Sequence, residues 1–417
     1  MAYLRRTVDD ELDELLSLTP AIALDGPKGV GKTATAQRRA TVGWLLDDLA
    51  QRALVQADPT FATTPAGTVL IDEWQRWPPV WDSVRRRVDE GAGPGRFLLT
   101  GSATPAAGVD THSGAGRILS LRMRPMALYE RGAASRPTVS LRRLLAGEHT
   151  MLTGRTTTSV GDYLSAIEAS GLPGVGSQHP RLRQGLLDAY LQRVIDRDLP
   201  DHGVAVRRPE TLRRWLAAYA AASSTTTAYS KILDASTGGD GSQPAKTTTI
   251  AYRDHLTQLM LLDPVPGWAP SLSPRARLQQ APKHQLADPG LAARLLGLSA
   301  TTLAAPRGAA MAGPLFESLA TLTVRVAAQA AQARVGHLRT RNGDHEVDLV
   351  VEGPDAQVVA IEVKLAAAVD DTDVRHLVWL REHLGEALVE AVVITTGTHA
   401  YRRPDGIAVV PLALLGA

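Results

Sequence analysis

Residues 26–33 read GPKGVGKT, and this short stretch constrains the fold more strongly than any other part of the chain. An apolar run, AIAL, precedes it, and a segment with helical periodicity follows it. Glycines at these positions let successive backbone N–H groups turn towards one anion, and the positive end of the following helix adds to the attraction. The stretch therefore predicts a strand, a phosphate-binding loop and a helix, in that order.

The loop brings its own candidate ligands. Lys32 would reach the β- and γ-phosphates of a nucleotide, and the hydroxyl of Thr33 would ligate Mg²⁺. The remaining positions would cradle the phosphates with their backbone; these are Gly26, Pro27, Lys28, Gly29, Val30, Gly31 and Ala34. We therefore predict ATP and Mg²⁺ as the cofactors of the N-terminal part.

Two further apolar runs end in residues that complete such a site. TVLIDE ends in Asp72, which would hold Mg²⁺, and Glu73, which would polarise the attacking water. FLLTGS ends in Thr100 and Ser102, either of which could sense the γ-phosphate. Three signals in this order are typical of a parallel α/β sheet that binds and hydrolyses ATP.

Arg117, in GAGRILSL, has two interpretations. It is either an arginine that stabilises negative charge in the transition state or a solvated loop residue. The sequence also leaves open whether it would act on the nucleotide of its own subunit or on that of a neighbour.

Composition limits the number of domains and the kinds of site. With 417 residues, the chain is long enough for two or three domains. It contains no cysteine, which excludes disulfides, thiolate catalysis and cysteine zinc sites and agrees with a cytoplasmic protein. The N-terminus lacks the apolar core of a signal peptide, and no apolar run is long enough to span a membrane. The net charge of +2 limits any nucleic-acid surface to a local patch.

Hydrophobic periodicity divides the chain into three parts. Residues 1–133 alternate short apolar runs with helical patterns, and the polar stretch 134–160 reads as a linker region. Residues 161–304 are mainly helical, and residues 305–417 combine one long helix with several apolar strands. We therefore expect a parallel α/β sheet domain, a helical middle domain and a C-terminal α/β domain.

The middle part has the element order of a winged helix. A helix is expected from Lys246 onwards, with three threonines and Arg253 exposed to DNA, and the basic loop 275–283 would form the wing. A winged helix that serves as a protein contact explains the same pattern equally well. The charges of QRVIDRDL, residues 192–199, are typical of a solvated ladder, although one of its arginines could approach a nucleotide.

Two expected strands in the last part carry acidic and basic residues on one face. In HEVDLVV, Glu346 and Asp348 point to the same side, and in IEVKL, Glu362 and Lys364 do so. Carboxylates suit Mg²⁺ or Mn²⁺, and Glu317 on the preceding helix could add one more. Asp348, Glu362 and Lys364 would then cleave a phosphodiester, with Lys364 orienting the nucleophile. A solvated strand face with ordinary ion pairs is the alternative.

Lysine usage supports a special task for some of these residues. Only six of the 45 basic residues are lysines, so the ordinary surface cations of this chain are arginines. A remaining lysine can mark a position where a compact ammonium is needed. Lys32 and Lys364 are the two lysines for which the sequence indicates such a task.

Together these motifs resemble the prokaryotic AAA-like ATPases that carry a C-terminal domain of unknown function 4143. The resemblance covers nearly the whole chain and rests on LDGPKGVGKT, VLIDEWQRWPPVWDSVRRRVDE, GRFLLTGSAT, AYLQRVIDRDL, GPLFESL and RTRNGDHEVDLVVE…AIEVK. It implies a P-loop ATPase fused to a winged helix and a restriction-endonuclease-like domain. The usual family form has arginine and glutamine where Lys28 and Gly29 stand, and we expect little consequence because these are cradle backbone positions.

Two functions follow as hypotheses. In the first, the ATPase cycle controls a DNA-directed C-terminal module, which could be a metal-dependent nuclease. In the second, the chain is an ATP-dependent switch or adaptor that binds DNA, a protein partner or further copies of itself without cutting. Dependence of ATP turnover on DNA would distinguish the two.

Overall fold

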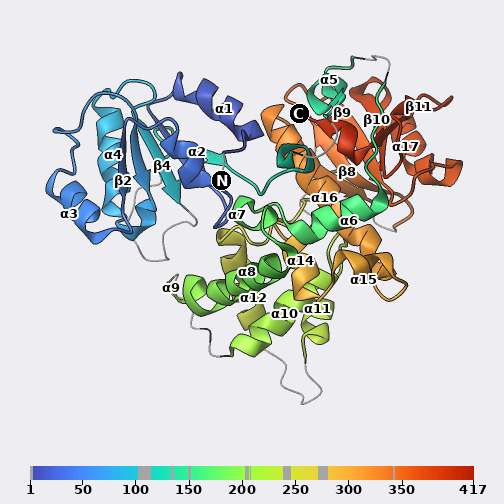
Figure 1. Cartoon of the computed structure of the whole chain (residues 1–417). Helices are drawn as coiled ribbons and strands as arrows, with labels where there is room; N and C mark the ends of the chain where they lie inside the picture. The colour runs from blue at the N-terminus through green and yellow to red at the C-terminus, as the bar shows by residue number, and fades with distance from the viewer. Residues whose placement is uncertain are drawn as a thin grey trace.

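The computed structural model in Figure 1 contains two α/β domains and a helical part between them. The N-terminal domain (blue to cyan) and the C-terminal domain (orange to red) lie side by side, and the helical part (green to yellow) lies below. The structure describes residues 3–101, 114–132, 136–148, 152–201, 206, 208–237, 246–270, 280–340 and 343–417. Within these ranges, no helix is both long enough and apolar enough to cross a lipid bilayer.

The N-terminal domain is built on five parallel strands in the order β2-β3-β4-β1-β5. The strands are β1 (Ala21–Asp25), β2 (Val42–Leu45), β3 (Val69–Asp72), β4 (Phe97–Gly101) and β5 (Leu119–Arg122). Around them lie α1 (Thr7–Leu16), α2 (Lys32–Gln37), α3 (Leu49–Ala57), α4 (Pro79–Asp89) and the 3-10 turns η1 (Trp74–Arg76) and η2 (Leu128–Arg131). The central strands are continuous apolar runs because both faces of a parallel sheet are covered. The predicted parallel α/β sheet is confirmed.

The middle part is helical. Its helices are α6 (Val160–Ala169), α7 (Pro173–Gly176), α8 (Pro180–Arg193), the π-helical turn η3 (Val194–Asp198), α9 (Leu199–Asp201), α10 (Pro209–Ala221), α11 (Tyr229–Ala235), α12 (Lys246–Gln258), α14 (Pro289–Leu295) and α15 (Ala300–Ala304). After α12, two antiparallel bridges, Leu262 with Leu286 and Val265 with Lys283, pair the chain with itself. We call residues 262–268 and 280–286 the hairpin arms; the segment 271–279 between them lies outside the described residues.

The C-terminal domain has a six-stranded mixed sheet in the order β11-β12-β10-β9-β8-β7. Its elements are α16 (Ala309–Ala330), β7 (Arg334–Arg339), β8 (Glu346–Glu352), β9 (Val358–Val363), α17 (Asp371–Leu384), η4 (Gly385–Ala387), β10 (Leu388–Thr395), β11 (Tyr401–Arg402), β12 (Ala408–Pro411), η5 (Leu412–Leu414) and β13 (Leu415–Gly416). The first hairpin arm joins the edge of this sheet, because the Trp268 N–H donates to His337 O at 2.7 Å. The predicted α/β domain is therefore confirmed, and the middle part is fastened to it.

The stretch expected to be a linker is largely structured. β6 (Val139–Ser140) pairs in parallel with β13, and α5 (Leu141–Leu145) follows it directly. Leu141, Leu144 and Leu145 are buried in the core, and Arg155 forms a bridge with His399. The prediction of a linker was wrong for these residues. The three leucines cover the C-terminal sheet, but the polar residues on either side of them in the sequence led to the interpretation as a linker.

One hydrophobic core runs through all three parts. It includes Leu24 of the N-terminal sheet, Leu164 of α6, Leu319 of α16 and Val392 of the C-terminal sheet. Apolar contacts that continue from one domain to the next resist independent movement of the domains. A change at one domain boundary will therefore be felt at the others.

Candidate functional site

The loop between β1 and α2 has the backbone of a phosphate cradle. Gly31, at the N-cap of α2, has a φ angle of 104°, which favours glycine and turns the neighbouring N–H groups inwards. A Cβ atom at Gly26 would lie 2.2 Å from the carbonyl oxygen of Met123, so only glycine fits there. These two positions require glycine for steric reasons, and they explain the spacing of the motif.

Lys32 lies at the centre of this loop and is buried. Its Nζ atom donates to the carbonyl oxygens of Gly26, at 2.7 Å, and Pro27, at 3.0 Å. Burial lowers the pKa of Lys32 to about 8, although the carboxylates of Glu73 and Asp72 oppose this shift. A desolvated ammonium at the N-terminus of a helix gains from a bound anion, so the loop suits the phosphates of a nucleotide.

Asp72 joins the loop to the ends of two strands. The Thr33 hydroxyl donates to its Oδ1 atom at 2.9 Å, and the Thr100 hydroxyl donates to the same oxygen. Hydroxyl and carboxylate oxygens that converge in this way are the ligands that Mg²⁺ prefers. The residues present thus fit Mg²⁺, with Thr33 and Asp72 as its holders and Thr100 fixing Asp72. Ser102, the other candidate for sensing the γ-phosphate, lies outside the described residues.

Glu73 follows Asp72 in a left-handed conformation, with φ 52° and ψ 45°. Such a conformation costs a non-glycine residue on the order of 1 kcal/mol, and such residues cluster at active sites. Burial raises the pKa of Glu73, and the nearby Lys32 limits the rise. The Gln75 amide donates to its Oε2 atom at 2.5 Å. A held and partly desolvated carboxylate beside the phosphate loop suits the polarisation of a water molecule.

An apolar cavity of about 200 Å³ adjoins the loop and was not predicted. It is lined by Tyr3, Leu4, Arg6, Val30, Gly31, Ala34, Thr35, Met123, Met126 and Pro173. Arg6 closes one side, because its guanidinium donates to Val30 O at 3.0 Å and forms an ion pair with Glu130 at 3.1 Å. A cavity of this kind beside a phosphate loop can hold the base of a nucleotide. Its residues come from four separate segments without a shared motif, so it could not be predicted from the sequence.

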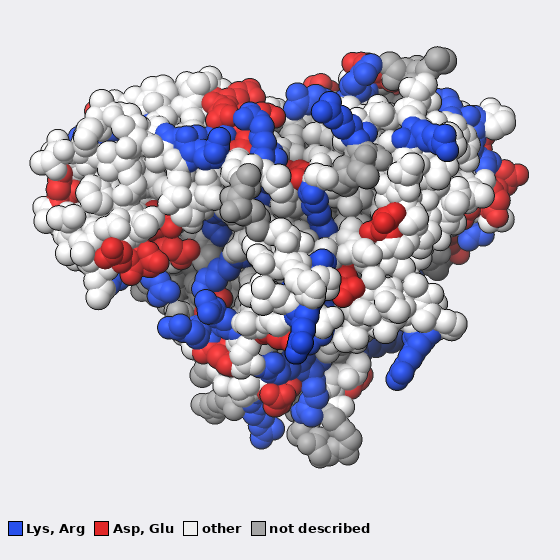
Figure 2. Space-filling view, viewed as in Figure 1, with Lys and Arg blue, Asp and Glu red and all other residues white. Residues whose placement is uncertain are grey.

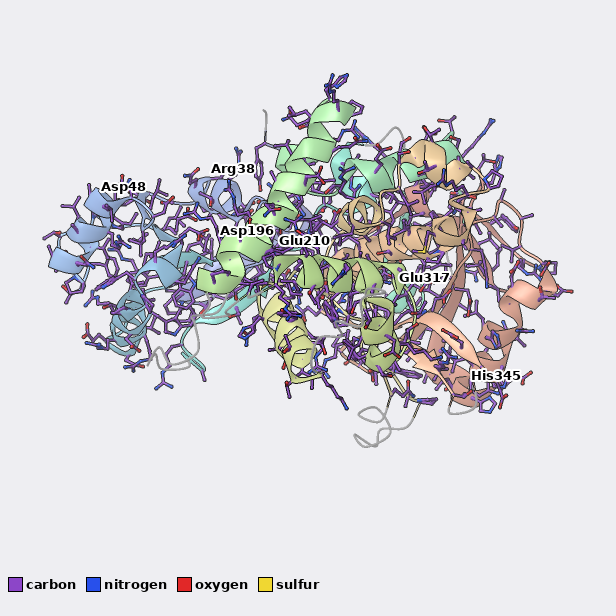
Figure 3. All side chains as sticks on the ribbon, turned by 90° about the horizontal axis from the view of Figure 1, so that it is seen from below. Arg38, Asp48, Asp196, Glu210, Glu317 and His345 are labelled. Carbon is purple, nitrogen blue, oxygen red and sulfur yellow. The ribbon has the colours of Figure 1, made fainter. Side chains whose placement is uncertain are left out.

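The middle part touches the phosphate loop directly. Lys28 forms an ion pair with Asp198, which is buried at the end of η3 and lies 170 positions away. A Cβ atom at Gly31 would lie 3.8 Å from Pro173, which places α7 against the same loop. In Figure 3, α8 runs towards the N-terminal domain with Asp196 near that end, whereas Glu317 lies on the other side of the molecule. We therefore correct the expectation that Lys28 serves only through its backbone.

Arg117 does not belong to this site within one chain. β5 runs parallel to β1 with Ile22 opposite Leu119, so the residues just before β5 lie at the opposite end of the sheet from the loop after β1. The Arg117 side chain is half exposed there and forms an ion pair with Asp89 at 2.9 Å. Arg117 as a ligand of its own nucleotide was therefore wrong, and the interpretation as a solvated residue fits the structure.

In the C-terminal domain, the predicted catalytic residues lie next to each other. β8 and β9 are antiparallel with Leu349 opposite Ile361, which places Asp348 beside Glu362. Asp348 Oδ2 accepts the Val363 N–H at 2.9 Å, and Lys364 Nζ lies 3.4 Å from Glu362 Oε2. The sequence thus predicted the proximity of these three side chains correctly.

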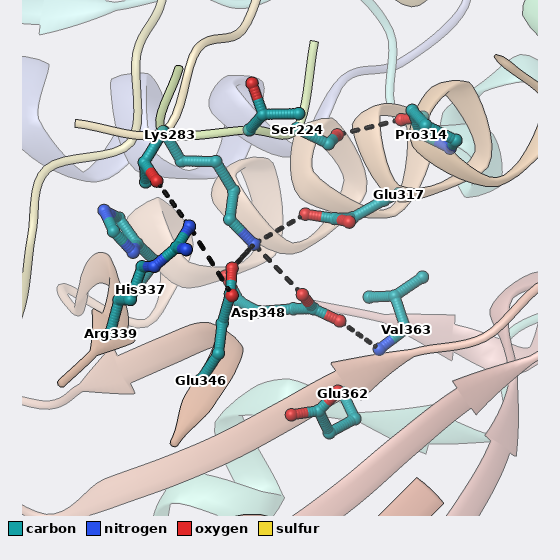
Figure 4. Close-up of polar contacts among 12 residues, drawn as sticks. Ser224, Lys283, Pro314, Glu317, His337, Arg339, Glu346, Asp348, Glu362 and Val363 are labelled. Carbon is teal, nitrogen blue, oxygen red and sulfur yellow. Dashed lines mark hydrogen bonds and ion pairs between the residues drawn. The ribbon is translucent and has the colours of Figure 1, made fainter. Parts of the chain in front are cut away.

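The ammonium of Lys283 occupies the centre of the predicted metal site (Figure 4). Its Nζ atom lies 2.8 Å from Glu317 Oε1, 3.0 Å from Asp348 Oδ1 and 3.8 Å from Glu346 Oε1. Lys283 belongs to the second hairpin arm and is fully buried. In the described parts of the chain, no group of acidic and histidine side chains is arranged to hold a metal ion. In this arrangement an ammonium lies where the predicted metal ion would lie, and the assignment of Glu317, Glu346, Asp348 and Glu362 as metal ligands stays a prediction.

The pKa values of the carboxyl groups around Lys283 determine the net charge of this cluster. Burial opposes ionisation of Asp348, but Lys283 and the Val363 N–H together hold its pKa below the usual value. Burial and the charge of Asp348 raise the pKa of Glu317 to about 8. Burial and Asp348 likewise raise the pKa of Glu362 well above its usual range. One ammonium facing one ionised carboxylate leaves little net charge for a divalent cation.

The expected DNA-reading surface of the middle part is only partly available. Thr249 of α12 is buried, although it was expected to be exposed. Arg253 donates to the Asp254 carboxylate at 2.7 Å and lies over the Tyr229 ring, 5.2 Å from its centroid. The hairpin arms, which correspond to the expected wing, are held by the C-terminal sheet, and Arg275 and Arg277 lie outside the described residues. A winged helix that contacts DNA therefore stays a prediction.

Three family models match the chain, one in each of its three parts. Family models match residues 18–131 as an AAA domain, 161–302 as a domain of unknown function (DUF8612) and 312–415 as a domain of unknown function (DUF4143). Two proteins described as uncharacterized, from Mycobacterium bovis and Mycobacterium tuberculosis, are each 27% identical over 362 residues, covering 84% of this chain and 71% of theirs. A solved Walker-type ATPase of Pyrococcus abyssi has 15% identity and a TM-score of 0.40, over 70% of this chain and 96% of that one.

The N-terminal match and the geometry around Lys32 agree on ATP as the ligand. The C-terminal match covers α16 and the sheet that holds Asp348. The chain therefore carries an AAA domain and, at its C-terminal end, a domain of unknown function 4143, the combination expected of an AAA-like P-loop ATPase.

Proposed function

We propose that this ATPase is a switch whose nucleotide state is transmitted from the phosphate loop to the middle part. The contact between Lys28 and Asp198 carries the proposal, because it joins the loop to a buried aspartate of another domain. Phosphates bound in the loop would compete with Asp198 for the Lys28 ammonium. Gain or loss of the γ-phosphate then changes how firmly η3 is held.

The residues of the site divide the work of hydrolysis. Lys32 would bind the β- and γ-phosphates after leaving the carbonyl oxygens of Gly26 and Pro27. Thr33 and Asp72 would hold Mg²⁺, which neutralises charge on the phosphate oxygens. Glu73 would orient and polarise the attacking water.

The apolar cavity would select the nucleotide. Its lining offers apolar surface from Val30, Met123, Met126 and Pro173 to the faces of a base. Asp and Glu do not occur among the residues that line it, and a guanine edge is commonly read by a carboxylate that accepts its N–H groups. An adenine base, which needs no such acceptor, therefore suits the cavity.

In this proposal the C-terminal domain does not cut DNA. The Lys283 ammonium neutralises the carboxylates that a catalytic metal would need. Its full burial means that a metal could replace it only if the hairpin arms moved. The domain would then serve as the support on which the middle part is held.

A latent nuclease is the second candidate. It is favoured by one observation, the arrangement of Asp348, Glu362 and Lys364 side by side on β8 and β9. Withdrawal of Lys283 during the ATP cycle would free these carboxylates for Mg²⁺ or Mn²⁺. The two candidates thus differ in whether Lys283 leaves its position.

Two assays test the proposal. ATP hydrolysis should be lost in Lys32→Ala and fall about 100-fold or more in Glu73→Gln, which should still bind ATP. Single-stranded, duplex and branched DNA would be incubated with Mg²⁺ or Mn²⁺, with and without ATP, using wild type, Lys364→Ala and Lys283→Met. We expect no cleavage by any of them. ATP-dependent cleavage by wild type that Lys364→Ala abolishes would replace the switch by the latent nuclease.

A further inference from the structure

A second cleft, partly lined by β5, is rich in arginine. It has a volume of about 530 Å³ and is lined by Glu11, Ser120, Leu121, Arg122, Arg124, Pro266, Arg325, Gln329, Gln332, Ala333, Arg334 and Val335. These residues come from the N-terminal domain, the first hairpin arm and the C-terminal domain. The cleft is therefore a junction of all three parts of the chain.

Part of this arginine cluster is fixed by a single buried carboxylate. Asp263 accepts from Arg124 Nε at 2.9 Å and from Arg325 Nη2 at 3.0 Å. Arg325 also donates to the carbonyl oxygens of Asp263 and Pro264, and Arg124 to Gln329. These two guanidinium groups are held rigidly and serve as the floor of the cleft.

Two further arginines line the cleft, and one of them has an unsatisfied donor. Arg122 reaches Asp263 through Nη2 at 3.2 Å, but its Nε–H is buried and has no hydrogen-bond partner among the described residues. Arg334 is exposed at the start of β7. The lining itself carries four arginines and one carboxylate, Glu11, whose pKa is raised by burial. Asp263 pairs with three of the arginines, Asp25 interacts with Arg122, and Glu352 lies opposite Arg334 in the β7–β8 ladder. A cleft lined by arginines that also holds a buried, unsatisfied N–H donor favours an anion.

We propose that this cleft binds the phosphate backbone of a nucleic-acid strand. Guanidinium groups pair with phosphate oxygens in a bidentate geometry, and four of them spread over the cleft match the repeated charges of a strand. Aromatic side chains do not occur in the lining, so the contacts would be to the backbone and independent of sequence. The lining of this cleft is also more polar than that of the cavity beside the phosphate loop, which suits a phosphate backbone better than a base.

The surface outside the cleft argues for a local site. On the face shown in Figure 2, groups of Lys and Arg alternate with groups of Asp and Glu. A polyanion would meet both signs of charge over this face. Binding would therefore depend on the few arginines of the cleft.

The position of the cleft links it to the ATPase. Arg122 ends β5 directly opposite Asp25, the last residue of β1, after which the phosphate loop begins. The charges of Lys32 and Arg122 both act on the Asp25 carboxyl. A strand bound at Arg122 would thus alter the field at the phosphate loop. Only this coupling rests on the switch proposed above.

Binding would be measured by fluorescence anisotropy with a labelled 20-nucleotide oligo-dT and full-length protein at 50 mM salt. All variants would carry Lys32→Ala as well, so that the phosphates of the oligonucleotide do not bind at the phosphate loop. Arg334→Gln should weaken binding several-fold and reduce the slope of log affinity against log salt by about one, and Arg334→Glu should weaken it about tenfold or more. Arg334 is exposed, so both variants should fold.

Arg87→Glu is the matched control, because Arg87 on α4 is also partly exposed and forms an ion pair with Glu90. It makes the same change of charge away from the cleft and should leave the affinity within about twofold. Equal loss of affinity in Arg87→Glu and Arg334→Glu would overturn the proposal, as would no binding by wild type. Inorganic phosphate that displaces the oligonucleotide at the same concentration of phosphate groups would assign the cleft to a small anion. That result would also overturn the proposal.

Discussion

Lys283 Nζ lies 3.0 Å from Asp348 Oδ1, although the two residues are 65 positions apart and belong to different parts of the chain. Lys283 comes from a hairpin arm of the middle part, and Asp348 comes from β8 of the C-terminal sheet. Both side chains are largely removed from water. The pair therefore fixes the position of the hairpin as firmly as its backbone hydrogen bonds do.

Removal of this ammonium should destabilise the fold strongly. In Lys283→Met the Asp348 carboxylate is left buried without its partner, which typically costs about 3–5 kcal/mol. We expect that loss in the free energy of unfolding, measured by urea denaturation. Lys364→Met is the control, since Lys364 is partly exposed and its loss should cost less than about 1 kcal/mol. Equal losses in the two variants would contradict a special role of Lys283.

The same position should control metal binding. Lys283→Ala opens space between the Glu317 and Asp348 carboxylates, which are then free to ligate a cation. Titration calorimetry of nucleotide-free protein with Mn²⁺ should show one more site in Lys283→Ala than in wild type. Since the N-terminal site is the same in both, the difference reports the C-terminal carboxylates. An equal number of sites would mean that Lys283 does not exclude a metal.

The raised pKa of Glu317 predicts how stability depends on pH. Below about pH 4.5 the Glu317 carboxyl is protonated in both the folded and the unfolded state. Between that value and about pH 8 it is ionised only in the unfolded state. The folded state then binds more protons, so stability falls as the pH rises, by up to about 1.4 kcal/mol per pH unit. In Glu317→Gln, the free energy of unfolding from denaturation curves should fall less steeply between about pH 5 and pH 8, the range between the two pKa values of Glu317. Parallel slopes for the two proteins would show that Glu317 does not titrate in this way.

Asp198→Asn should disconnect the middle part from the nucleotide. In wild type, a non-hydrolysable ATP analogue should change hydrogen exchange along α8 and η3, because Lys28 is shared between Asp198 and the phosphates. The variant should bind the analogue within about threefold of wild type but lose this change. Asp196→Asn is the control, as Asp196 is exposed and bonds to Gln192 of its own helix. A response retained in Asp198→Asn would exclude this route of transmission.

Substitution of Arg117 should have little effect on a single subunit. Arg117→Ala removes an exposed ion pair with Asp89, which contributes less than about 1 kcal/mol. ATP turnover should stay within about twofold of wild type. Measurement over a range of protein concentrations would reveal any contribution across a subunit interface. A large loss at all concentrations would contradict the position of Arg117 at the far end of the sheet.

Local motifs made part of the molecule predictable. Lys32, Thr33, Asp72 and Glu73 follow strand ends, and parallel strands bring such ends to one edge of a sheet without further information. Asp348 and Glu362 were predictable for a similar reason, because adjacent antiparallel strands with alternating side chains bring them together.

Contacts between distant segments were not predictable. The lysine count marked lysines as special, but it favoured Lys364 over Lys283, since only Lys364 stands in a recognisable strand pattern. The position of Lys283 depends on the contact between the hairpin arms and the edge of the C-terminal sheet. No local sequence pattern predicts that contact. The prediction for Arg117 was wrong for a related reason. Its distance from the phosphate loop follows from the direction of β5 and not from the residues next to it in the sequence.

The pairing of β6 with β13 has a consequence for the synthesis of the protein. Val139–Ser140 leaves the ribosome some 275 residues before its partner, Leu415–Gly416, so this sheet cannot close until translation has passed the whole middle part. The five strands of the N-terminal sheet lie within residues 21–122, so this sheet can form first. Until α16, β9 and β10 emerge, the leucines of α5 lack the surfaces that they cover in the folded protein, so residues 139–145 form an exposed apolar segment of the nascent chain.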